Sequence, residues 1–376
     1  MDGLLGGTHQ REGTSMRRYS PTAAGTSLRL QGLSKNFENT RAVVDVDLEV
    51  REGEFYSIVG PSGSGKTTLL RLIAGFEKPS SGRIYLGEND ITEYPPQGRS
   101  MAMVFQNYAL FPHMTVWQNV AFGLQAHRVP RPDVHRRVAD VLDLVQLNRK
   151  ASDPVTQLSG GEQQRAAVAR ALVVEPAVLL MDEPLSNLDV SLRLETREQL
   201  RLLQQRIGIT TLYVTHDQSE ALGLSDRIAV MSGGELIQKG TPREVYDNPR
   251  SLFVASFLGN ANMISGTVVR KQRRSVEVAA QKGLKFSVPY EGGLSKGESV
   301  IVAVKPEHIT IVRGSRSGMF SAKVVSVQFQ GMFTEYLLQS QGNVLRVLQT
   351  GKDSPVRVGS TVSVDVDSSK CSVFKA

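Results

Sequence analysis

Residues 60–67 read GPSGSGKT, in which a glycine, four further residues and then Gly-Lys-Thr have the spacing of a phosphate-binding loop. The glycines let the backbone turn so that successive N–H groups point at phosphate oxygens. Lys66 supplies a positive charge for the outer phosphates, the Thr67 hydroxyl can bind Mg²⁺, and Thr68 can reach an inner phosphate. The expected nucleotide contacts are Gly60, Pro61, Ser62, Gly63, Ser64, Gly65, Lys66, Thr67 and Thr68.

Two acids follow a second apolar run, VLLMDEP at 178–184. A strand that ends in Asp182 brings a carboxylate to the carboxyl edge of a parallel sheet, where open α/β folds bind their ligands. We expect Asp182 to hold Mg²⁺, directly or through water. Glu183 is then placed to orient or deprotonate a water that attacks the terminal phosphate.

A second glycine-rich stretch, LSGGEQQR at 158–165, raises the question of what its backbone approaches. A Ser-Gly-Gly that opens a helix is an anion site, since its N–H groups and the positive helix end face outward. Two such surfaces in one domain cannot both grip the same nucleotide, because each approaches from its own side. We therefore predict a head-to-tail dimer, with each nucleotide between the phosphate loop of one chain and the Ser-Gly-Gly of its partner. Hydrolysis then requires closure of the dimer.

The elements that must position these residues follow from the hydrophobic pattern. Short apolar runs alternate with longer helical patterns up to about residue 245, which predicts βα units and a mostly parallel sheet. A helix is expected to start at Lys66, and another to cover 134–147. Strands are expected at 54–60, 177–184 and 210–217, and a hairpin at 227–240.

The chain is expected to divide into an α/β phosphate-loop domain followed by a small all-β barrel. From about residue 262 onward, short alternating runs are separated by turn residues, which is typical of an all-β barrel or sandwich. The expected parts are a flexible tail at 1–26, the α/β domain at 27–245 with a helical subdomain at about 107–170, a linker at 246–261 and the all-β domain at 262–376.

Composition favours a globular intracellular protein. The chain has 376 residues, of which 40% are hydrophobic and 22% charged. Cys371 is the single cysteine, so no internal disulfide can form and a reducing compartment is expected. The sequence contains no secretory signal and no apolar run of the roughly 18 residues that span a bilayer. The net charge is +7, but basic residues are interspersed with acidic ones almost everywhere, and this argues against a nucleic-acid partner.

The chain resembles the nucleotide-binding subunit of ATP-binding cassette (ABC) transporters over residues 28–376, and LSGGEQQR resembles the signature loop of that family. The resemblance implies ATP and Mg²⁺ as cofactors. It implies that Gln106, in VFQNYALFPHMTV, senses Mg²⁺ and the attacking water, and that His216, in YVTHDQ, contacts the γ-phosphate. It implies that Phe37 stacks on adenine and that Asp189 ends the SNLD loop between the two sites. The γ-phosphate contacts that it implies across the dimer are Ser159, Gly160 and Gly161.

The all-β tail resembles the TOBE extension of ABC importers that work with an external solute-binding protein. FVASFLGNANMISGTVV and VKPEHITI resemble its entry and a central motif, although the family commonly has arginine at Lys305. The implied partners are membrane permease subunits, a second or paralogous cassette and, indirectly, the binding protein. The implied location is the cytoplasmic face of the inner membrane. Residues around FLGNANM and in QFQGMFTEYLLQSQGNVLRV resemble polyamine (spermidine/putrescine) and ferric-iron members, and we predict a polyamine.

Several alternatives stay open at this point. Ferric iron, sugar, sulfate or phosphonate import remains possible, because the solute does not touch this chain. A soluble ABC ATPase acting on ribosomes or DNA usually carries two cassettes or a coiled-coil insert, which this chain lacks. A phosphate-loop kinase would leave LSGGEQQR and SNLD without a role. The β tail could also bind a regulatory ligand, and Met16 is an alternative start.

Overall fold

The structure is a computed structural model that describes residues 25–280, 285–312, 320–340, 343–351 and 356–376. Residues 1–24 of the predicted tail, including Met16, lie outside the described residues. Two compact units are present: a helical unit containing Ser100–Thr210, and a β-rich unit containing Ser27–Arg99 and Thr211–Ala376. No helix in the described part of the chain is both long enough and apolar enough to cross a membrane.

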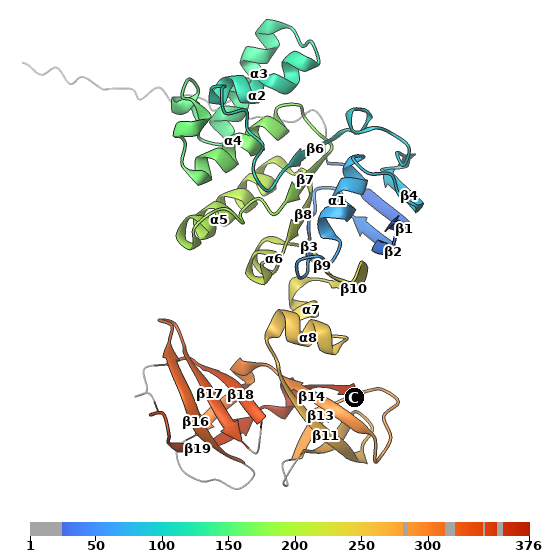
Figure 1. Cartoon of the computed structure of the whole chain (residues 1–376), viewed down its shortest axis with the longest axis vertical. Helices are drawn as coiled ribbons and strands as arrows, with labels where there is room; N and C mark the ends of the chain where they lie inside the picture. The colour runs from blue at the N-terminus through green and yellow to red at the C-terminus, as the bar shows by residue number, and fades with distance from the viewer. Residues whose placement is uncertain (1–24, 281–284, 313–319, 341–342, 352–355) are drawn as a thin grey trace, which may run out of the picture. The chain divides into compact units, whose positions relative to one another are not determined.

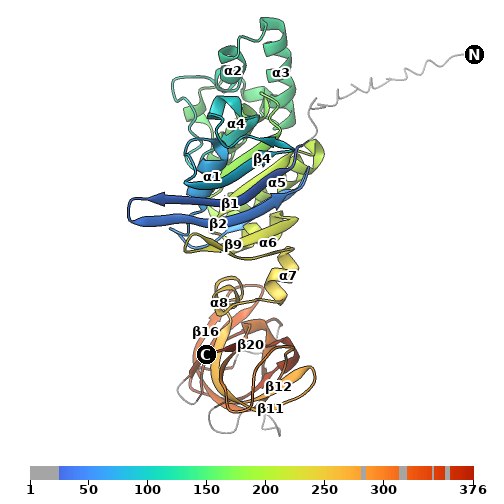
Figure 2. The same ribbon diagram turned by 90° about the vertical axis from the view of Figure 1, so that its right-hand side faces the viewer.

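The amino-terminal part of the β-rich unit carries the predicted phosphate loop. Its elements are β1 (Leu28–Phe37), β2 (Thr40–Val50), β3 (Phe55–Val59), α1 (Lys66–Ala74), β4 (Ser81–Leu86), β5 (Asn89–Asp90), β8 (Thr210–Thr215), α6 (Gln218–Leu224), β9 (Arg227–Ser232) and β10 (Glu235–Gly240). β3 pairs in parallel with both β8 and β9, and β10 pairs antiparallel with β9. β1 pairs antiparallel with β2 and β4, and Figure 2 shows β1 and β2 as two long neighbouring strands.

Burial explains why these segments fold as they do. All five residues of β3 are buried, as expected for a parallel strand with both faces covered. α1 starts after Gly65 and ends at Gly75, and both glycines have left-handed backbone conformations. The strands predicted at 54–60 and 210–217, the helix at Lys66 and the hairpin at 227–240 are confirmed as β3, β8, α1 and the β9–β10 pair.

The carboxy-terminal part of the β-rich unit is all-β, as predicted. Helices α7 (Pro242–Asp247) and α8 (Leu252–Gly259) lead into it. Among the described residues it has two antiparallel sheets, ordered β13-β12-β11-β14-β20 and β15-β19-β16-β17-β18, which Figure 1 shows beside each other. One hydrophobic core joins them. The strands are β11 (Asn262–Lys271), β12 (Ser275–Ala280), β13 (Lys285–Pro289), β14 (Ser299–Val304), β15 (Ile309–Val312), β16 (Phe320–Phe329), β17 (Thr334–Ser340), β18 (Asn343–Gln349), β19 (Thr361–Val366) and β20 (Ser372–Lys375).

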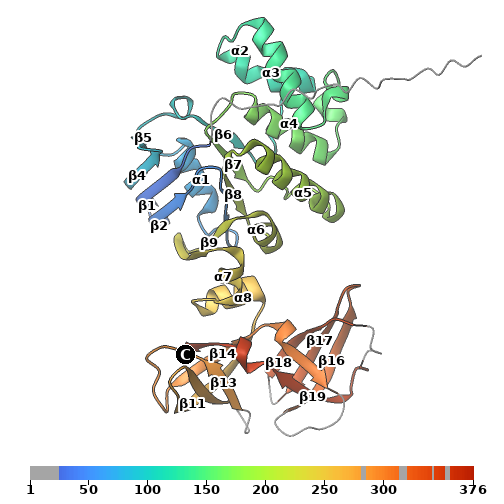
Figure 3. The same cartoon turned by 180° about the vertical axis from the view of Figure 1, so that it is seen from behind.

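The helical unit packs four helices with a pair of parallel strands. Its elements are β6 (Met101–Val104), α2 (Val116–Ala126), α3 (Arg131–Leu144), α4 (Gly160–Leu172), β7 (Val178–Asp182) and α5 (Val190–Ile207). β6 pairs in parallel with β7, whose five residues are all buried. Buried side chains of α3 recur at Val134, Val138 and Val141, the spacing of an amphipathic helix. Figure 3 shows α2, α3 and α4 grouped together.

Candidate nucleotide-binding site

The phosphate loop is packed tightly on one side and open on the other. A Cβ on Gly60 would lie 2.1 Å from the carbonyl oxygen of Met231, and one on Gly65 would lie 2.2 Å from that of Ala42. Gly65 also has a φ of 100°. A Cβ on Gly63, where φ is 78°, would meet nothing within 4 Å. The loop is therefore held against neighbouring backbone and forms an open cradle at Gly63.

Lys66 extends over this loop from the start of α1. Its side chain is buried, and its ammonium group donates to the carbonyl oxygens of Gly60 and Pro61, each at 2.9 Å. A third contact, to the Ser64 hydroxyl, is 3.5 Å long. An ammonium group over a turn of backbone amides at a helix N-terminus fits the oxygens of a polyphosphate. The residues present therefore fit a nucleoside triphosphate.

The hairpin tip of β1 and β2 carries Phe37. Its side chain is 42% exposed, which is high for a phenylalanine and leaves ring surface for stacking. The Lys35 ammonium group lies 4.7 Å from the centre of the same ring. Adenine stacking by Phe37 stays a prediction.

Thr215, the residue before His216, is hydrogen-bonded to a buried carboxylate and to the residue after His216. His216 directly follows β8 and is exposed. Thr215 donates its hydroxyl proton to Glu220 of α6 at 2.7 Å and accepts from the N–H of Asp217 at 2.9 Å. Tyr213 donates to the same Glu220 oxygen, also at 2.7 Å. These bonds fix the turn that contains His216. The sequence did not predict that Glu220 holds this turn.

In the helical unit, β7 ends in the two predicted acids. Asp182 is buried, with 7% of its surface exposed. Glu183 has a left-handed backbone with a φ of 45°, which costs a non-glycine residue about 1–2 kcal/mol. Its carbonyl oxygen accepts from the N–H of Ser186 at 3.2 Å and from the Ser186 hydroxyl at 2.9 Å. Strained residues gather at functional sites, where their neighbours hold them in place.

The Ser-Gly-Gly corner begins α4 with a capping box. Ser159 accepts from the N–H of Glu162, and the Glu162 carboxylate accepts from the N–H of Ser159 at 2.9 Å. The Lys150 ammonium group, 2.6 Å from Glu162, and then the Ser159 N–H hold the pKa of Glu162 below its usual range. The glycines approach apolar side chains of their own unit: a Cβ on Gly160 would lie 2.8 Å from Leu188.

The SNLD segment contacts the loop that contains Gln106. The Asn187 amide donates to the backbone oxygen of Gln106 at 2.8 Å, while the Gln106 side chain is exposed just after β6. Asp189 caps α5 by accepting from the N–H of Leu192 at 2.9 Å and from the Ser191 hydroxyl at 2.8 Å. The Leu192 and then the Ser191 bonds lower the pKa of Asp189.

Comparison with known proteins identifies the family. Residues 43–186 match the ABC transporter family, and residues 302–374 match the TOBE domain. The spermidine/putrescine import ATP-binding protein PotA of Rubrobacter xylanophilus is 40% identical, over 97% of this chain and 98% of that protein. The chain belongs to the ABC transporter family.

Other members of the ABC transporter family agree with this assignment. The protein of the same name from Vibrio cholerae is 43% identical over 84% of this chain and 85% of its own length. The solved structure of cbiO1 from Clostridium perfringens, part of the ABC transporter complex cbiONQ, has a TM-score of 0.55 and 33% identity. It covers 59% of this chain and 90% of cbiO1.

The two units divide the predicted ABC site residues between them. The β-rich unit contains Phe37, the loop from Gly60 to Thr68, and His216. The helical unit contains Gln106, Ser159, Gly160, Gly161, Asp182, Glu183 and Asp189. Within the helical unit, contacts join the Gln106 backbone to the SNLD loop, and that loop to Glu183 and to the Ser-Gly-Gly corner.

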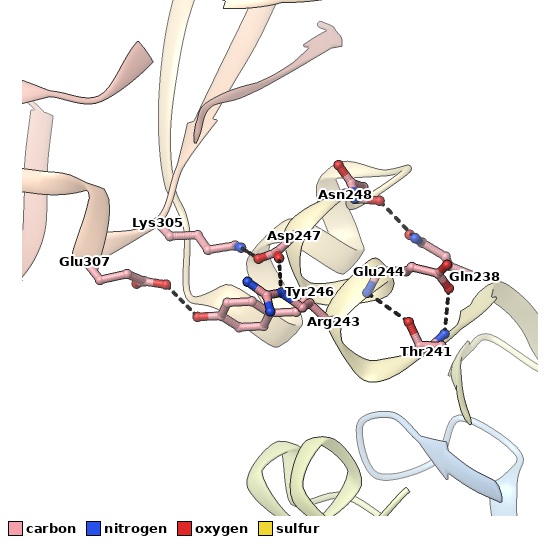
Figure 4. Close-up of polar contacts among 9 residues, drawn as sticks. All are labelled: Gln238, Thr241, Arg243, Glu244, Tyr246, Asp247, Asn248, Lys305 and Glu307. Atoms are coloured by element: carbon pink, nitrogen blue, oxygen red, sulfur yellow. Dashed lines mark hydrogen bonds and ion pairs between the residues drawn. The ribbon is translucent and has the colours of Figure 1, made fainter. Parts of the chain in front are cut away.

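A polar cluster joins α7 to the TOBE region of this ABC chain (Figure 4). The ammonium group of Lys305 lies 3.7 Å from the ring centre of Tyr246 and 3.5 Å from the Asp247 carboxylate. The Tyr246 hydroxyl donates to Glu307 at 2.7 Å. Burial lowers the pKa of Lys305, although Asp247 opposes the shift. The motif VKPEHITI therefore contributes both Lys305 and Glu307 to one contact, which the sequence alone did not indicate.

Proposed function

We propose that this chain is the ATP-binding subunit of a spermidine/putrescine importer. The observation that carries the proposal is an open phosphate loop, with Lys66 above it, in a chain that resembles spermidine/putrescine import ATP-binding proteins over nearly its whole length. The chain is an ATPase of the ABC type. ATP hydrolysis supplies the free energy for solute uptake.

The chemical roles of the site residues form part of this proposal. Glu183 orients and deprotonates the attacking water, and its fixed left-handed backbone supports a positioning role. His216 contacts the γ-phosphate from the turn that Glu220 holds. Gln106 senses the attacking water through its exposed side chain. Mg²⁺, held by Thr67 and Asp182 together with Gln106, would neutralise charge on the phosphate oxygens.

The assembly that we propose is a pair of cassettes with two nucleotides between them. Ser159, Gly160 and Gly161 of one chain complete the γ-phosphate site of its partner, and Asp189 lies between the two sites. The capping box supports this role because it fixes the start of α4 while Ser159 stays exposed. The partner cassette is a second copy or a paralogue.

Membrane permease subunits are the partners that the family implies. We further propose an external solute-binding protein and a location at the cytoplasmic face of the inner membrane. The proposed domains are an ABC ATPase domain at 27–245, with its helical subdomain at about 107–170, a linker at 246–261 and the TOBE domain at 262–376. Phe37 is the proposed adenine-stacking residue.

Uptake by the reconstituted importer tests the proposed solute. Vesicles that contain this chain with its permease subunits, ATP on the side of the chain and the binding protein outside, should accumulate labelled spermidine and putrescine. Lys66→Ala should abolish uptake, whereas Lys78→Ala, which alters a highly exposed lysine paired with Glu93, should not. Uptake of ferric iron, a sugar, sulfate or a phosphonate in place of the polyamines would refute the solute. Phosphoryl transfer to a small acceptor would refute transport.

A further inference from the structure

The turn that follows Gln106 contains two consecutive residues with left-handed backbone conformations. Tyr108 has a φ of 62° and Ala109 a φ of 48°. Non-glycine residues adopt this conformation rarely and as single residues, because Cβ then crowds the following carbonyl oxygen. Two in succession need an external group that holds them in place.

That group is the guanidinium of Arg170, in the last turn of α4. It donates to the carbonyl oxygen of Ala109 at 2.6 Å and to that of Tyr108 at 2.8 Å. The same guanidinium lies 5.6 Å from the ring centre of Phe111. The planar fork of arginine can bond two adjacent carbonyl oxygens at once, which a lysine ammonium group cannot reproduce with the same geometry. The left-handed turn presents both oxygens to that fork.

Both ends of the same segment are held by other elements of the helical unit. Asn187 donates to the backbone oxygen of Gln106 at 2.8 Å. At the other end, the fully buried Asn119 of α2 accepts from the N–H of Phe111 at 2.8 Å and donates to its carbonyl oxygen at 3.1 Å. Arg170 holds the middle of the segment, so the position of the turn depends on the position of α4.

We propose that Arg170 is a positioning residue that ties the turn after Gln106 to the helix that begins at Ser159. A shift of α4 then moves the Gln106 segment with it, so that closure of the Ser-Gly-Gly corner on ATP also places Gln106. The proposal rests on the proposed function, because the roles of Gln106 and Ser159 belong to it. Arg170 donates to the turn after Gln106, within the helical unit, so we expect its loss to change turnover rather than nucleotide affinity.

The test measures kcat and KM for ATP hydrolysis by the full-length chain carrying Arg170→Lys. We expect kcat to fall about tenfold, the equivalent of one good hydrogen bond, with KM within about twofold of the unchanged protein. Arg137→Lys is the matched control, since Arg137 lies in the same unit and pairs with Glu175 instead. A parallel rise in KM, or unchanged turnover, would overturn the proposal.

Ala109→Gly separates a positioning role from a purely structural one. Glycine adopts a positive φ without a steric penalty, so the left-handed turn depends less on Arg170 when residue 109 is glycine. We expect Ala109→Gly to restore at least about one third of the kcat lost in Arg170→Lys and to change the otherwise unaltered chain by less than about twofold. If the double variant stays as slow as Arg170→Lys, Arg170 merely stabilises α4 and the proposal is wrong.

Hydrogen exchange distinguishes failure of this proposal from failure of the proposed function. Amide exchange reports local opening directly and needs no ATP. Exchange at the amides of residues 108–111 should be about tenfold faster in Arg170→Lys than in the unaltered chain. Faster exchange in a chain without ATPase activity would refute the proposed function and leave the positioning contact supported. Unchanged exchange would overturn the positioning contact whatever the activity.

Discussion

Three glycines of the phosphate loop differ in why they must be glycine, and alanine substitutions should separate the reasons. At Gly60 a Cβ would lie 2.1 Å from a backbone oxygen, and the residue is not among the glycines with positive φ. At Gly63 φ is 78° but the space beyond is open. At Gly65 both conditions apply, with a φ of 100° and a contact of 2.2 Å.

The expected loss of stability follows from these two contributions. Gly63→Ala should lower the free energy of unfolding by about 1 kcal/mol, because alanine is strained in a left-handed conformation. Gly60→Ala forces a shift of the backbone at Met231, which costs about 3 kcal/mol by analogy with overpacked cores. Gly65→Ala combines the left-handed strain with the close backbone contact, so we expect a loss of about 4 kcal/mol in the free energy of unfolding.

Urea unfolding of the full chain without nucleotide measures these differences, and binding of a fluorescent ATP analogue gives the affinity. The affinities should not follow the stabilities. The methyl group of Gly63→Ala points into the open cradle, so this least destabilised variant should lose ATP affinity by at least about tenfold through a clash of roughly 1.4 kcal/mol. Gly293→Ala, which has open space around it and no positive φ, should leave both quantities unchanged.

Gly63→Ala binding ATP like the unaltered chain would contradict an open phosphate cradle at Gly63. A loss of stability in Gly63→Ala as large as that in Gly65→Ala would also contradict it, because the space beside Gly63 would then be closed.

Three further outcomes are expected. Glu183→Gln should keep ATP affinity within about twofold while turnover falls at least about 100-fold, measured by phosphate release, since a positioned base contributes factors of that size. Tyr246→Phe should cost about 1 kcal/mol of unfolding free energy in urea by removing the bond to Glu307, and Tyr246→Leu about 1 kcal/mol more by removing the ring under Lys305. The pKa of Glu162 is lower in the folded chain than its unfolded value near 4.5. The ionised carboxylate therefore stabilises the fold at pH values above 4.5. This stabilisation is lost as the pH falls through the folded pKa. The stability advantage over Glu162→Gln should therefore shrink in urea titrations between about pH 6 and pH 3; an advantage that grew toward acid would contradict the contact.

Features encoded in short contiguous stretches could be predicted from the sequence. The phosphate loop lies between a buried strand and a helix, and both ends obey local rules of burial and glycine conformation. The Ser159 capping box was also readable, since a serine followed three residues later by a glutamate marks a helix start. The prediction of phosphate binding at those residues did not include the cap.

Contacts between distant residues could not be predicted in this way. The sequence predicted that Gly160 and Gly161 approach a phosphate. It did not predict their contacts with Leu188 and Leu192, which lie later in the chain. Arg170 reaches carbonyl oxygens some sixty residues earlier, and no local pattern pairs them. Lys305 lies in the motif VKPEHITI, but its partner Tyr246 lies on α7, and only folding brings the two residues together.

Light scattering of Glu183→Gln with and without Mg-ATP tests most directly whether the nucleotide is shared between two chains. We expect ATP to convert this variant to a species of twice the mass of one chain. Adding Ser159→Arg should abolish that species while each chain still binds one nucleotide. A Glu183→Gln chain that binds ATP yet stays monomeric, with a monomeric unaltered chain turning over ATP at full rate, would contradict a nucleotide shared between two chains.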